Sequence, residues 1–208
     1  RMPDKTIAGV ILAGGRARRL GGRDKNHLVI RDDHDDRPGR SIIVRQVDLL
    51  QRVAARVYVA TTPADHAAQP DRFSGLPVVV VTDAVDGAGP LAGLYAALRA
   101  TTAGRLLVLA GDLPFLSPAL LEALADVPSW ADGQWVVTPR GPEPLVACYR
   151  RRIADRLGRL LRDGERRAAS LGAGLAMAAL DEDALARLGD PARLLTNINT
   201  PDDLRRVQ

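Results

Sequence analysis

The hydrophobic residues of the chain follow two patterns that alternate along it. Short continuous apolar runs predict strands, because such runs are typical of strands buried on both faces. Segments with apolar residues on one helical face lie between them and predict helices. Residues 61–74 show neither pattern and are expected to form a loop. The predicted strands are a run that begins at Ile7, then 57–60, 77–82 and 106–110, with a weakly alternating antiparallel edge pair at 134–138 and 144–149; the predicted helices are 41–53, one entered through 87–94 that continues to about Ala100, then 119–125, 153–161, 183–188 and a terminal helix capped by 200–203.

This order of elements predicts the fold class and the place of the site. Strands that alternate with helices at this spacing indicate an α/β fold, with an open, doubly wound, mostly parallel sheet and helices on both faces. The length suits a single domain over residues 1–208, in which 1–4 are expected to be a tag remnant. In such sheets ligands bind beyond the carboxyl ends of the strands. Gly14, Asp83 and Asp112 each follow a predicted strand, so we expect them to share one crevice.

The first strand leads into a segment rich in glycine and arginine, Gly14 to Lys25. Adjacent glycines let backbone N–H groups approach an anion closely, because no Cβ intervenes. Residues 16–25 hold five cations and one anion, and their net charge of +4 equals that of the whole chain. The positive potential is therefore concentrated on one loop, which predicts a site for a phosphorylated ligand. The spacing matches neither a Walker loop nor the G-x-G-x-x-G dinucleotide fingerprint.

Composition narrows the classes of function. No apolar run approaches the ~20 residues of a membrane span and no signal sequence is recognisable, so we expect a cytoplasmic protein without a membrane partner. The single cysteine, Cys148, cannot form an internal disulfide and fits a reducing compartment. The three histidines lack ligand spacing, which disfavours a zinc site. Aromatic residues are only 3% of the chain, so despite a pI near 9.8 we expect a mono- or dinucleotide-sized anion rather than nucleic acid.

These residue types suit transfer of a nucleotidyl group to a phosphate acceptor. A phosphate with a second pKa of about 6 is largely ionised near pH 7, so no strong general base is required. The obstacle is the approach of two anions, which cations and a magnesium ion relieve. The loop supplies Arg19, Arg23 and Lys25. Asp112 is the first candidate for the magnesium ligand, because Mg²⁺ commonly takes one or two protein carboxylates together with phosphate oxygens and water.

Four further candidate residues each have two interpretations. Asp83 helps to hold the nucleotide or a metal-bound water, or it only caps the following turn. Gly93 lets the backbone approach a ligand closely, or it allows a tight helix entry. Asn197 and Asn199 lie two apart on an extended segment and point the same way. They either hydrogen-bond a polar heterocycle or an ion, or they are surface residues before a helix cap.

The pattern L-A-G-G-x-x-x-R-L-G-G-x-D-K over residues 12–25 resembles the signature of nucleotidyltransferases that have an N-terminal Rossmann-like domain, and most closely the molybdenum cofactor guanylyltransferases. The likeness covers nearly the whole chain. The glycine-rich loop and the block Asp112–Phe115 are typical of the class as a whole. Gly89–Gly93 also matches, and the blocks Gly164–Arg167 and Thr196–Leu204 are similar to the guanylyl-transferring subgroup.

The resemblance implies a reaction and a role for each matched residue. GMP from GTP would be joined to the molybdenum cofactor (molybdopterin) with release of pyrophosphate, in the presence of Mg²⁺. Proteins that deliver or receive the cofactor are compatible partners. By resemblance, Leu12, Ala13 and Gly14 would contact the guanine nucleotide, Gly15 and Arg19 would lie close to its phosphates, Lys25 would bind phosphate, Asp83 would bind the nucleotide, Asp112 would bind nucleotide and magnesium, and Arg166, Asn197 and Asn199 would lie toward the molybdopterin.

The chain departs from the family pattern at two places. Ala60-Thr61-Thr62 stands where the family often has an asparagine, so one contact to the base or sugar lacks its usual residue, and the charged segment 31–40 is longer than the usual turn. Three other functions stay open. They are cytidylyl transfer to the same cofactor, nucleotidyl transfer to a sugar, alditol or isoprenoid phosphate, and a non-enzymatic module that binds nucleotide or delivers cofactor.

Overall fold

The structure is a computed structural model that describes residues 6–14, 25–30, 39–83, 87 and 89–206. For Lys25, Pro201 and Arg206 it describes the backbone alone. The expected tag remnant, most of the charged segment 31–40 and the loop residues 15–24 lie outside this part of the chain.

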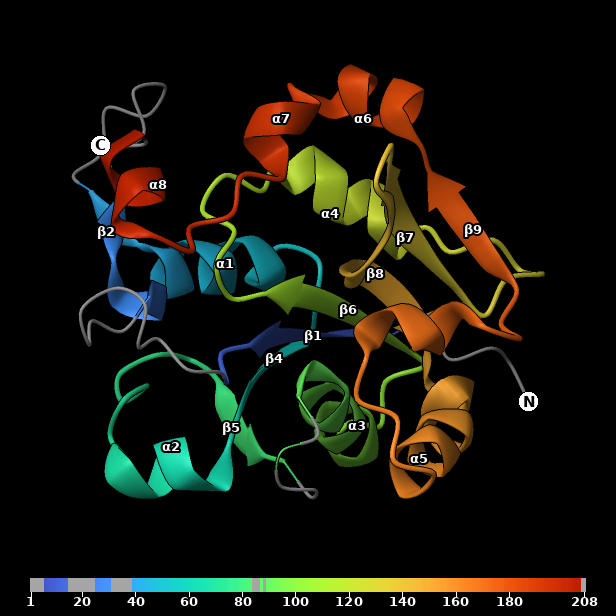
Figure 1. The fold of residues 1–208 in the computed structure, drawn as a ribbon, viewed down its shortest axis with the longest axis horizontal. Coiled ribbons are helices and arrows are strands. Elements are labelled where there is room, and N and C mark those ends of the chain that lie inside the picture. The colour runs from blue at the N-terminus through green and yellow to red at the C-terminus, as the bar shows by residue number, and fades with distance from the viewer. Residues whose placement is uncertain (1–5, 15–24, 31–38, 84–86, 88, 207–208) are drawn as a thin grey trace.

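A seven-stranded sheet forms the centre of the fold (Figure 1). Its strand order is β5-β4-β1-β6-β8-β7-β9, and β8 runs antiparallel to both of its neighbours while the other described pairs in this sheet are parallel. The prediction of a mostly parallel sheet is confirmed. The strands are β1 (Ile7–Leu12), β4 (Arg56–Thr61), β5 (Val79–Thr82), β6 (Arg105–Ala110), β7 (Gly133–Thr138), β8 (Gly141–Arg150) and β9 (Met177–Leu180), with a separate antiparallel pair of β2 (Val29–Ile30) and β3 (Arg40–Ser41).

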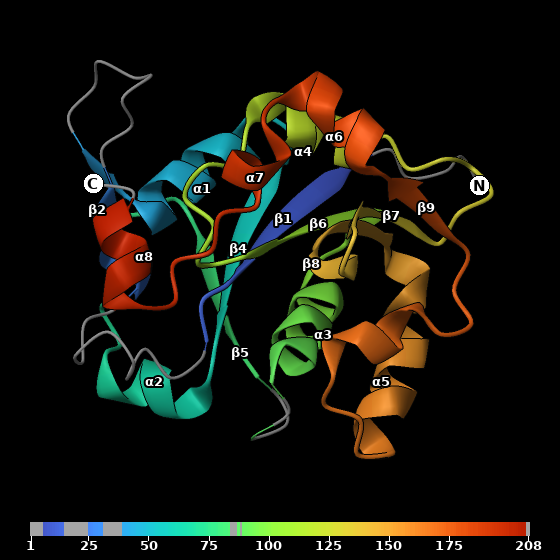
Figure 2. The same ribbon diagram turned by 45° about the horizontal axis from the view of Figure 1, so that its top comes forward.

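Helices cover both faces of this sheet, as expected (Figures 1 and 2). Successive side chains of a strand point to opposite faces, so Val10 and Ile11 of β1 are both fully buried but belong to different core clusters. Helices α1, α4 and α6 pack on the face of Ile11, and α3 and α5 pack on the face of Val10. The helices are α1 (Ile42–Gln51), α2 (Pro63–Ala68), α3 (Pro90–Ala100), α4 (Pro118–Ala125), α5 (Ala154–Arg162), α6 (Glu182–Leu188), α7 (Pro191–Leu194) and α8 (Pro201–Arg206), with 3₁₀ helices η2 (Lys25–His27), η3 (Arg151–Ile153) and η4 (Ala168–Gly172).

The register brings the carboxyl ends of the parallel strands β5, β4, β1 and β6 together at one end of the sheet. Leu12 at the end of β1 lies opposite Ala60 of β4 and Ala110 of β6. Just beyond the strands, the N–H of Asp83 donates to Thr61 O at 3.1 Å, and the N–H of Gly111 donates to Leu12 O at 3.2 Å. The residues that follow β1, β5 and β6 therefore start from the same level of the sheet.

Three local predictions are wrong. The expected loop 61–74 contains α2, which buries none of its residues and so leaves no apolar periodicity in the sequence. Its start is fixed by the Thr62 hydroxyl, which accepts from the N–H of Asp65 at 3.0 Å, and by a first-turn proline. Strand β5 is an edge strand with Val79 41% exposed, rather than a strand buried on both faces. At the opposite edge lies the unpredicted β9, so the β7–β8 pair is internal.

No helix in the described part of the chain combines the length and the apolar character that crossing a membrane requires.

Candidate functional site

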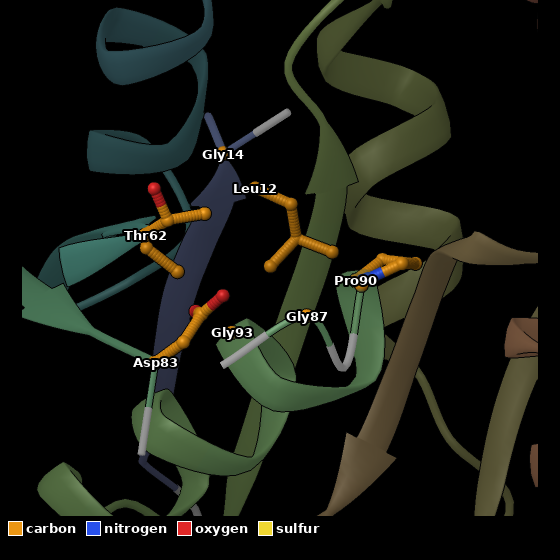
Figure 3. A pocket seen from close by; sticks show the side chains of 9 residues that line it. Leu12, Gly14, Thr62, Asp83, Gly87, Pro90 and Gly93 are labelled. Carbon is orange, nitrogen blue, oxygen red and sulfur yellow. The ribbon is translucent and has the colours of Figure 1, made fainter. Parts of the chain in front are cut away.

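A cavity of about 380 Å³ opens at the carboxyl ends of β1, β4 and β5 (Figure 3). The strands end at different residues, but their register carries Leu12, Ala60 and Asp83 to its wall. The carboxylate of Asp83 points into the space between Thr62, Leu12 and the first turn of α3. A small, largely apolar hollow with one acidic group suits a flat polar ring. Its described lining consists of Leu12, Gly14, Ala60, Thr62, Asp83, Gly87, Gly89, Pro90 and Gly93.

Gly93 forms the floor of this cavity from within α3. A Cβ at this position would lie 3.0 Å from Ala60 Cβ, 3.2 Å from Leu12 Cδ2 and 3.3 Å from Asp83 Oδ1. It is the fourth residue of the helix and is buried, so it does not form the helix entry. The entry is made instead by Gly89, whose φ of 62° is one that residues with a side chain rarely adopt. Gly93 therefore lets α3 pack closely on β1 and β4 beneath the cavity, and close approach of a ligand stays a prediction.

Asp112 and Asn197 form a second group, one strand away from the cavity. Asp112 follows Gly111 at the end of β6, and Asn197 lies on the extended segment before α8. With its nitrogen turned toward the carboxylate, the Asn197 amide donates to Asp112 Oδ1 at 2.7 Å and to Oδ2 at 3.0 Å. The N–H of Ile198 donates to Asp112 O at 3.1 Å and fixes this juxtaposition. The described lining of the cavity does not include Asp112, so the expected crevice is divided between these two adjoining places.

Donors from other elements hold the backbone around Asp112. Gln46, 1% exposed on α1, donates through Nε2 to Ala110 O at 2.8 Å and to Leu113 O at 3.1 Å. Asn26 Nδ2 donates to Gly111 O at 2.7 Å, and Arg45 Nε donates to Pro114 O at 3.1 Å. Five consecutive carbonyls, those of residues 110–114, therefore face protein donors.

These supporting residues are not among those predicted from the sequence. For Gln46 a signal existed, because it lies three residues after Ile43 and next to Val47 on the apolar face of the predicted helix, where a polar side chain needs a buried partner. For Asn26 the sequence held no comparable signal, because it lies between Lys25 and His27, and for Arg45 none existed because an arginine on a helix usually extends to solvent.

A third group lies at the rim beside Gly89. The carbonyl oxygen of Arg166 is 3.5 Å from the position that a Cβ on Gly89 would take. The Arg166 guanidinium donates to Leu161 O at 3.2 Å and to Glu165 O at 3.0 Å, which ties it to the end of α5. The N–H of Arg167, followed by the Ser170 hydroxyl and the N–H of Arg166, stabilises the Glu165 carboxylate and lowers its pKa to about 2. This loop is thus ordered by its own residues at the edge of the cavity.

The remaining predicted residues are placed differently. Ala13 is buried in the core on the face of Ile11, its N–H donates to Ala60 O at 2.9 Å, and the described lining of the cavity does not include it. Lys25 begins η2, next to Asn26, and Asn199 is exposed on the same extended segment as Asn197. Gly15 and Arg19 lie outside the described residues.

Comparison with known proteins gives the family. The MobA-like NTP transferase domain matches residues 9–182. The chain belongs to this family. A relative from Chloroflexus aggregans, described as a probable molybdenum cofactor guanylyltransferase, is 37% identical over 210 residues, which cover 97% of this chain and 93% of the relative. A relative from Mycobacterium tuberculosis H37Rv with the same description is 36% identical over 201 residues, covering 93% and 89%.

Solved structures agree with this membership. The molybdopterin-guanine dinucleotide biosynthesis protein A from Archaeoglobus fulgidus superposes with a TM-score of 0.76 at 27% identity, over 96% of both chains. The inositol-1-phosphate CTP transferase from T. maritima, 15% identical, has a TM-score of 0.67 over 96% of this chain and 92% of its own and shares the fold. This MobA-like chain is therefore a nucleotidyltransferase, a kind of enzyme that generally uses a divalent metal ion.

Proposed function

We propose that the chain transfers GMP from GTP to the molybdenum cofactor and releases pyrophosphate. The main support is the juxtaposition at one sheet edge of a glycine-walled cavity that holds a carboxylate and, one strand away, the Asp112–Asn197 pair. The descriptions of the relatives at 36–37% identity name the same reaction. The reaction would take place in the cytoplasm, where the buried thiol of Cys148 stays reduced and where proteins that deliver or receive the cofactor could act as partners.

The cavity would hold the guanine base. Guanine presents two adjacent N–H donors, at N1 and the 2-amino group, and a carboxylate can accept from both at once. Cytosine offers only its exocyclic amino group on the corresponding edge, so the same carboxylate would pair with it less well. Asp83 is the carboxylate in position to make this distinction, and the small residues Gly14 and Gly93 leave room for the ring. This is why we favour GTP over CTP.

Asp112 and Asn197 would hold a magnesium ion. The amide atom that faces the carboxylate lies 2.7 and 3.0 Å from its two oxygens. Rotation of the amide by half a turn would place an oxygen there, and two ligand oxygens of an octahedral Mg²⁺ are about 3 Å apart. Among the described residues no cluster of three or more His, Cys, Asp or Glu forms a metal cage. One carboxylate and one amide suit an ion that completes its coordination with phosphate and water.

The chain's own groups account for the remaining requirements of the reaction. An oxygen of the acceptor phosphate attacks the α-phosphorus of GTP, a new P–O bond forms, and the bond to the leaving pyrophosphate breaks. The acceptor is already ionised near neutral pH, so the site needs no proton-abstracting residue. Bound magnesium would offset the negative charge on the leaving pyrophosphate. Lys25 and Arg19 of the glycine-rich loop would stabilise phosphate charge, and Leu12, Ala13, Gly14 and Gly15 would follow the nucleotide with their backbone.

The acceptor would approach from the side of the α5–η4 loop and the segment before α8. Arg166 lies at the rim beside Gly89, and Asn199 lies exposed near Asn197. These residues would contact the molybdopterin, an assignment that follows the family resemblance.

A screen of nucleotides against acceptors tests this proposal. Pyrophosphate release is measured with GTP or CTP, each with molybdenum cofactor, an alditol phosphate or a sugar phosphate as acceptor. We expect release only with GTP and molybdenum cofactor, and a loss of that release in Asp112→Asn. Preference for CTP would reject the nucleotide assignment, and release with a sugar or alditol phosphate would reject the acceptor. Tight GTP binding without release from any pair would favour a binding module.

A further inference from the structure

The guanidinium of Arg72 joins the two ends of the glycine-rich segment. Arg72 lies in the turns after α2. Its Nη2 donates to Asn26 Oδ1 at 2.8 Å, and its Nη1 donates to Ala13 O at 3.4 Å. Ala13 directly precedes residues 14–25 and Asn26 directly follows them. The Arg72 guanidinium therefore contacts the residues on both sides of this segment. A guanidinium can do this because its N–H groups form a rigid fork.

The amide of Asn26 carries this connection on to the strand that leads to Asp112. Asn26 is 6% exposed, and while its oxygen accepts from Arg72 its nitrogen donates to Gly111 O at 2.7 Å. Lys25 and Asp112 are the sequence neighbours of the two bonded residues. The bond therefore sets the spacing between the backbones that carry the cation and the carboxylate.

The residue after Arg72 supports the same contact. The Phe73 ring is 5% exposed, and the Arg72 guanidinium carbon lies 4.9 Å from its centroid. On η2, the imidazole of His27 stacks against the same ring at 6.0 Å with an interplanar angle of 20°. Arg72 and Phe73 thus hold consecutive residues of η2, one through hydrogen bonds and the other through ring contacts. The contact between the turns after α2 and η2 therefore consists of several hydrogen bonds and ring contacts, and does not depend on a single hydrogen bond between flexible side chains.

We propose that Arg72 and Asn26 are positioning residues, which fix the ends of the glycine-rich loop against the strand that carries Asp112. They act through Lys25 and Asp112 and contact no substrate atoms themselves. A shift of about 1 Å between reacting groups can cost about 100-fold in rate. Removing either side chain should therefore lower mainly kcat. The cavity at Asp83 and Gly93 should keep its affinity for the base. This inference rests on the proposed nucleotidyl transfer for its kinetic part only.

The test compares Arg72→Met, which keeps the length and apolar stem of the side chain, with Asn26→Asp, which can accept from Arg72 but cannot donate to Gly111 O. In both variants we expect kcat for pyrophosphate release to fall about 10- to 100-fold, with the affinity for guanosine, which lacks the phosphate, changed less than twofold. The matched control is Arg99→Met, because Arg99 is exposed near the end of α3, away from the site. It is expected to keep the wild-type kcat. Because both substitutions break the same chain of contacts, the double variant should lose little more than either single variant.

A second measurement separates this inference from the proposed function. Amide hydrogen exchange needs no turnover, and we expect Arg72→Met to accelerate exchange several-fold at Ala13 and Gly111 while peptides of α4 and α5 are unchanged. If the wild type transfers no nucleotide but exchange responds in this way, the proposed function fails and the positioning contact stands. Unchanged exchange at Ala13 and Gly111, or wild-type kcat in a folded Arg72→Met, would overturn the inference.

Discussion

Gly93 offers the sharpest test of where the nucleotide binds. Substitution by alanine places a methyl group 3.0 Å from Ala60 Cβ, 3.2 Å from Leu12 Cδ2 and 3.3 Å from Asp83 Oδ1. These neighbours must yield by a few tenths of an ångström, which costs stability. Replacing a glycine inside a helix by alanine also raises the free energy of unfolding by about 1 kcal/mol, because alanine has the higher helix propensity. The two effects oppose each other, so we expect the thermal midpoint of Gly93→Ala to stay within a few degrees of the wild type.

Binding should respond quite differently from stability. The added methyl group occupies the floor of the cavity beside the Asp83 carboxylate, where a base would lie. We expect the dissociation constant for GTP to rise about tenfold, equivalent to about 1.4 kcal/mol, and to rise further in Gly93→Val. Titration calorimetry with GTP and Mg²⁺ measures the affinity, and differential scanning calorimetry measures the stability.

Gly158 on α5 provides the matched control. A Cβ there would lie 3.1 Å from Tyr95 Cε2 and 3.2 Å from Tyr95 Oη, so Gly158→Ala combines similar crowding with the same gain in helix propensity outside the cavity lining. It should bind GTP like the wild type. Wild-type affinity in Gly93→Ala, or an equal loss in Gly158→Ala, would refute the location of the site.

Three other predictions concern the metal, the support of Asp112 and pH. Asp112→Asn should lower pyrophosphate release about 10²- to 10³-fold; unchanged release with normal GTP binding would exclude the metal role. Gln46→Met should cost about 1–3 kcal/mol in urea unfolding by leaving buried carbonyls unpaired and should also lower kcat, whereas the control Gln134→Met, which loses the bond to Ala123 O, should lower stability alone; equal kcat in both variants would contradict positioning. Because the folded state lowers the pKa of Glu165 from 4.5 to about 2, its stabilising effect is present above pH 4.5 and is lost as pH falls toward 2. The difference in thermal midpoint between wild type and Glu165→Gln should therefore narrow from pH 6 to pH 3, and a constant difference would show that the carboxylate charge is not the cause.

The central strands could be predicted because both of their faces are buried, which makes nearly every residue in them apolar. Strands β1 and β6 bury both faces and read as continuous apolar runs, and α3 and α4 show their starts through Pro90 and the Ser117-Pro118 pair. The Ser117 hydroxyl accepts from Leu120 N–H, as that sequence predicts. By contrast, α2 buries nothing, and the short β9 is defined by its pairing with β7 rather than by its own pattern. Such elements depend on contacts distant in sequence.

The sequence predicted several residues of the site, but it did not predict which of them contact one another. Gly14, Asp83 and Asp112 follow their strands as expected, because β1, β5 and β6 are parallel and end at one level. The pairing of Asn197 with Asp112 could not be deduced, since 85 residues separate them and only the fold decides which residues meet. The support from Gln46 and Asn26 was missed for the same reason.

The five bonded carbonyls of residues 110–114 bear on which ions the enzyme can use. Each of these oxygens accepts a hydrogen bond from α1, η2 or the segment before α8, which holds it toward the protein donor and leaves it one lone pair rather than two for a cation. Calcium, which needs six to eight oxygen ligands, would find its coordination incomplete there, whereas a smaller ion that keeps several of its waters would not. Selection by ion size would thus originate in hydrogen bonds that never touch the metal.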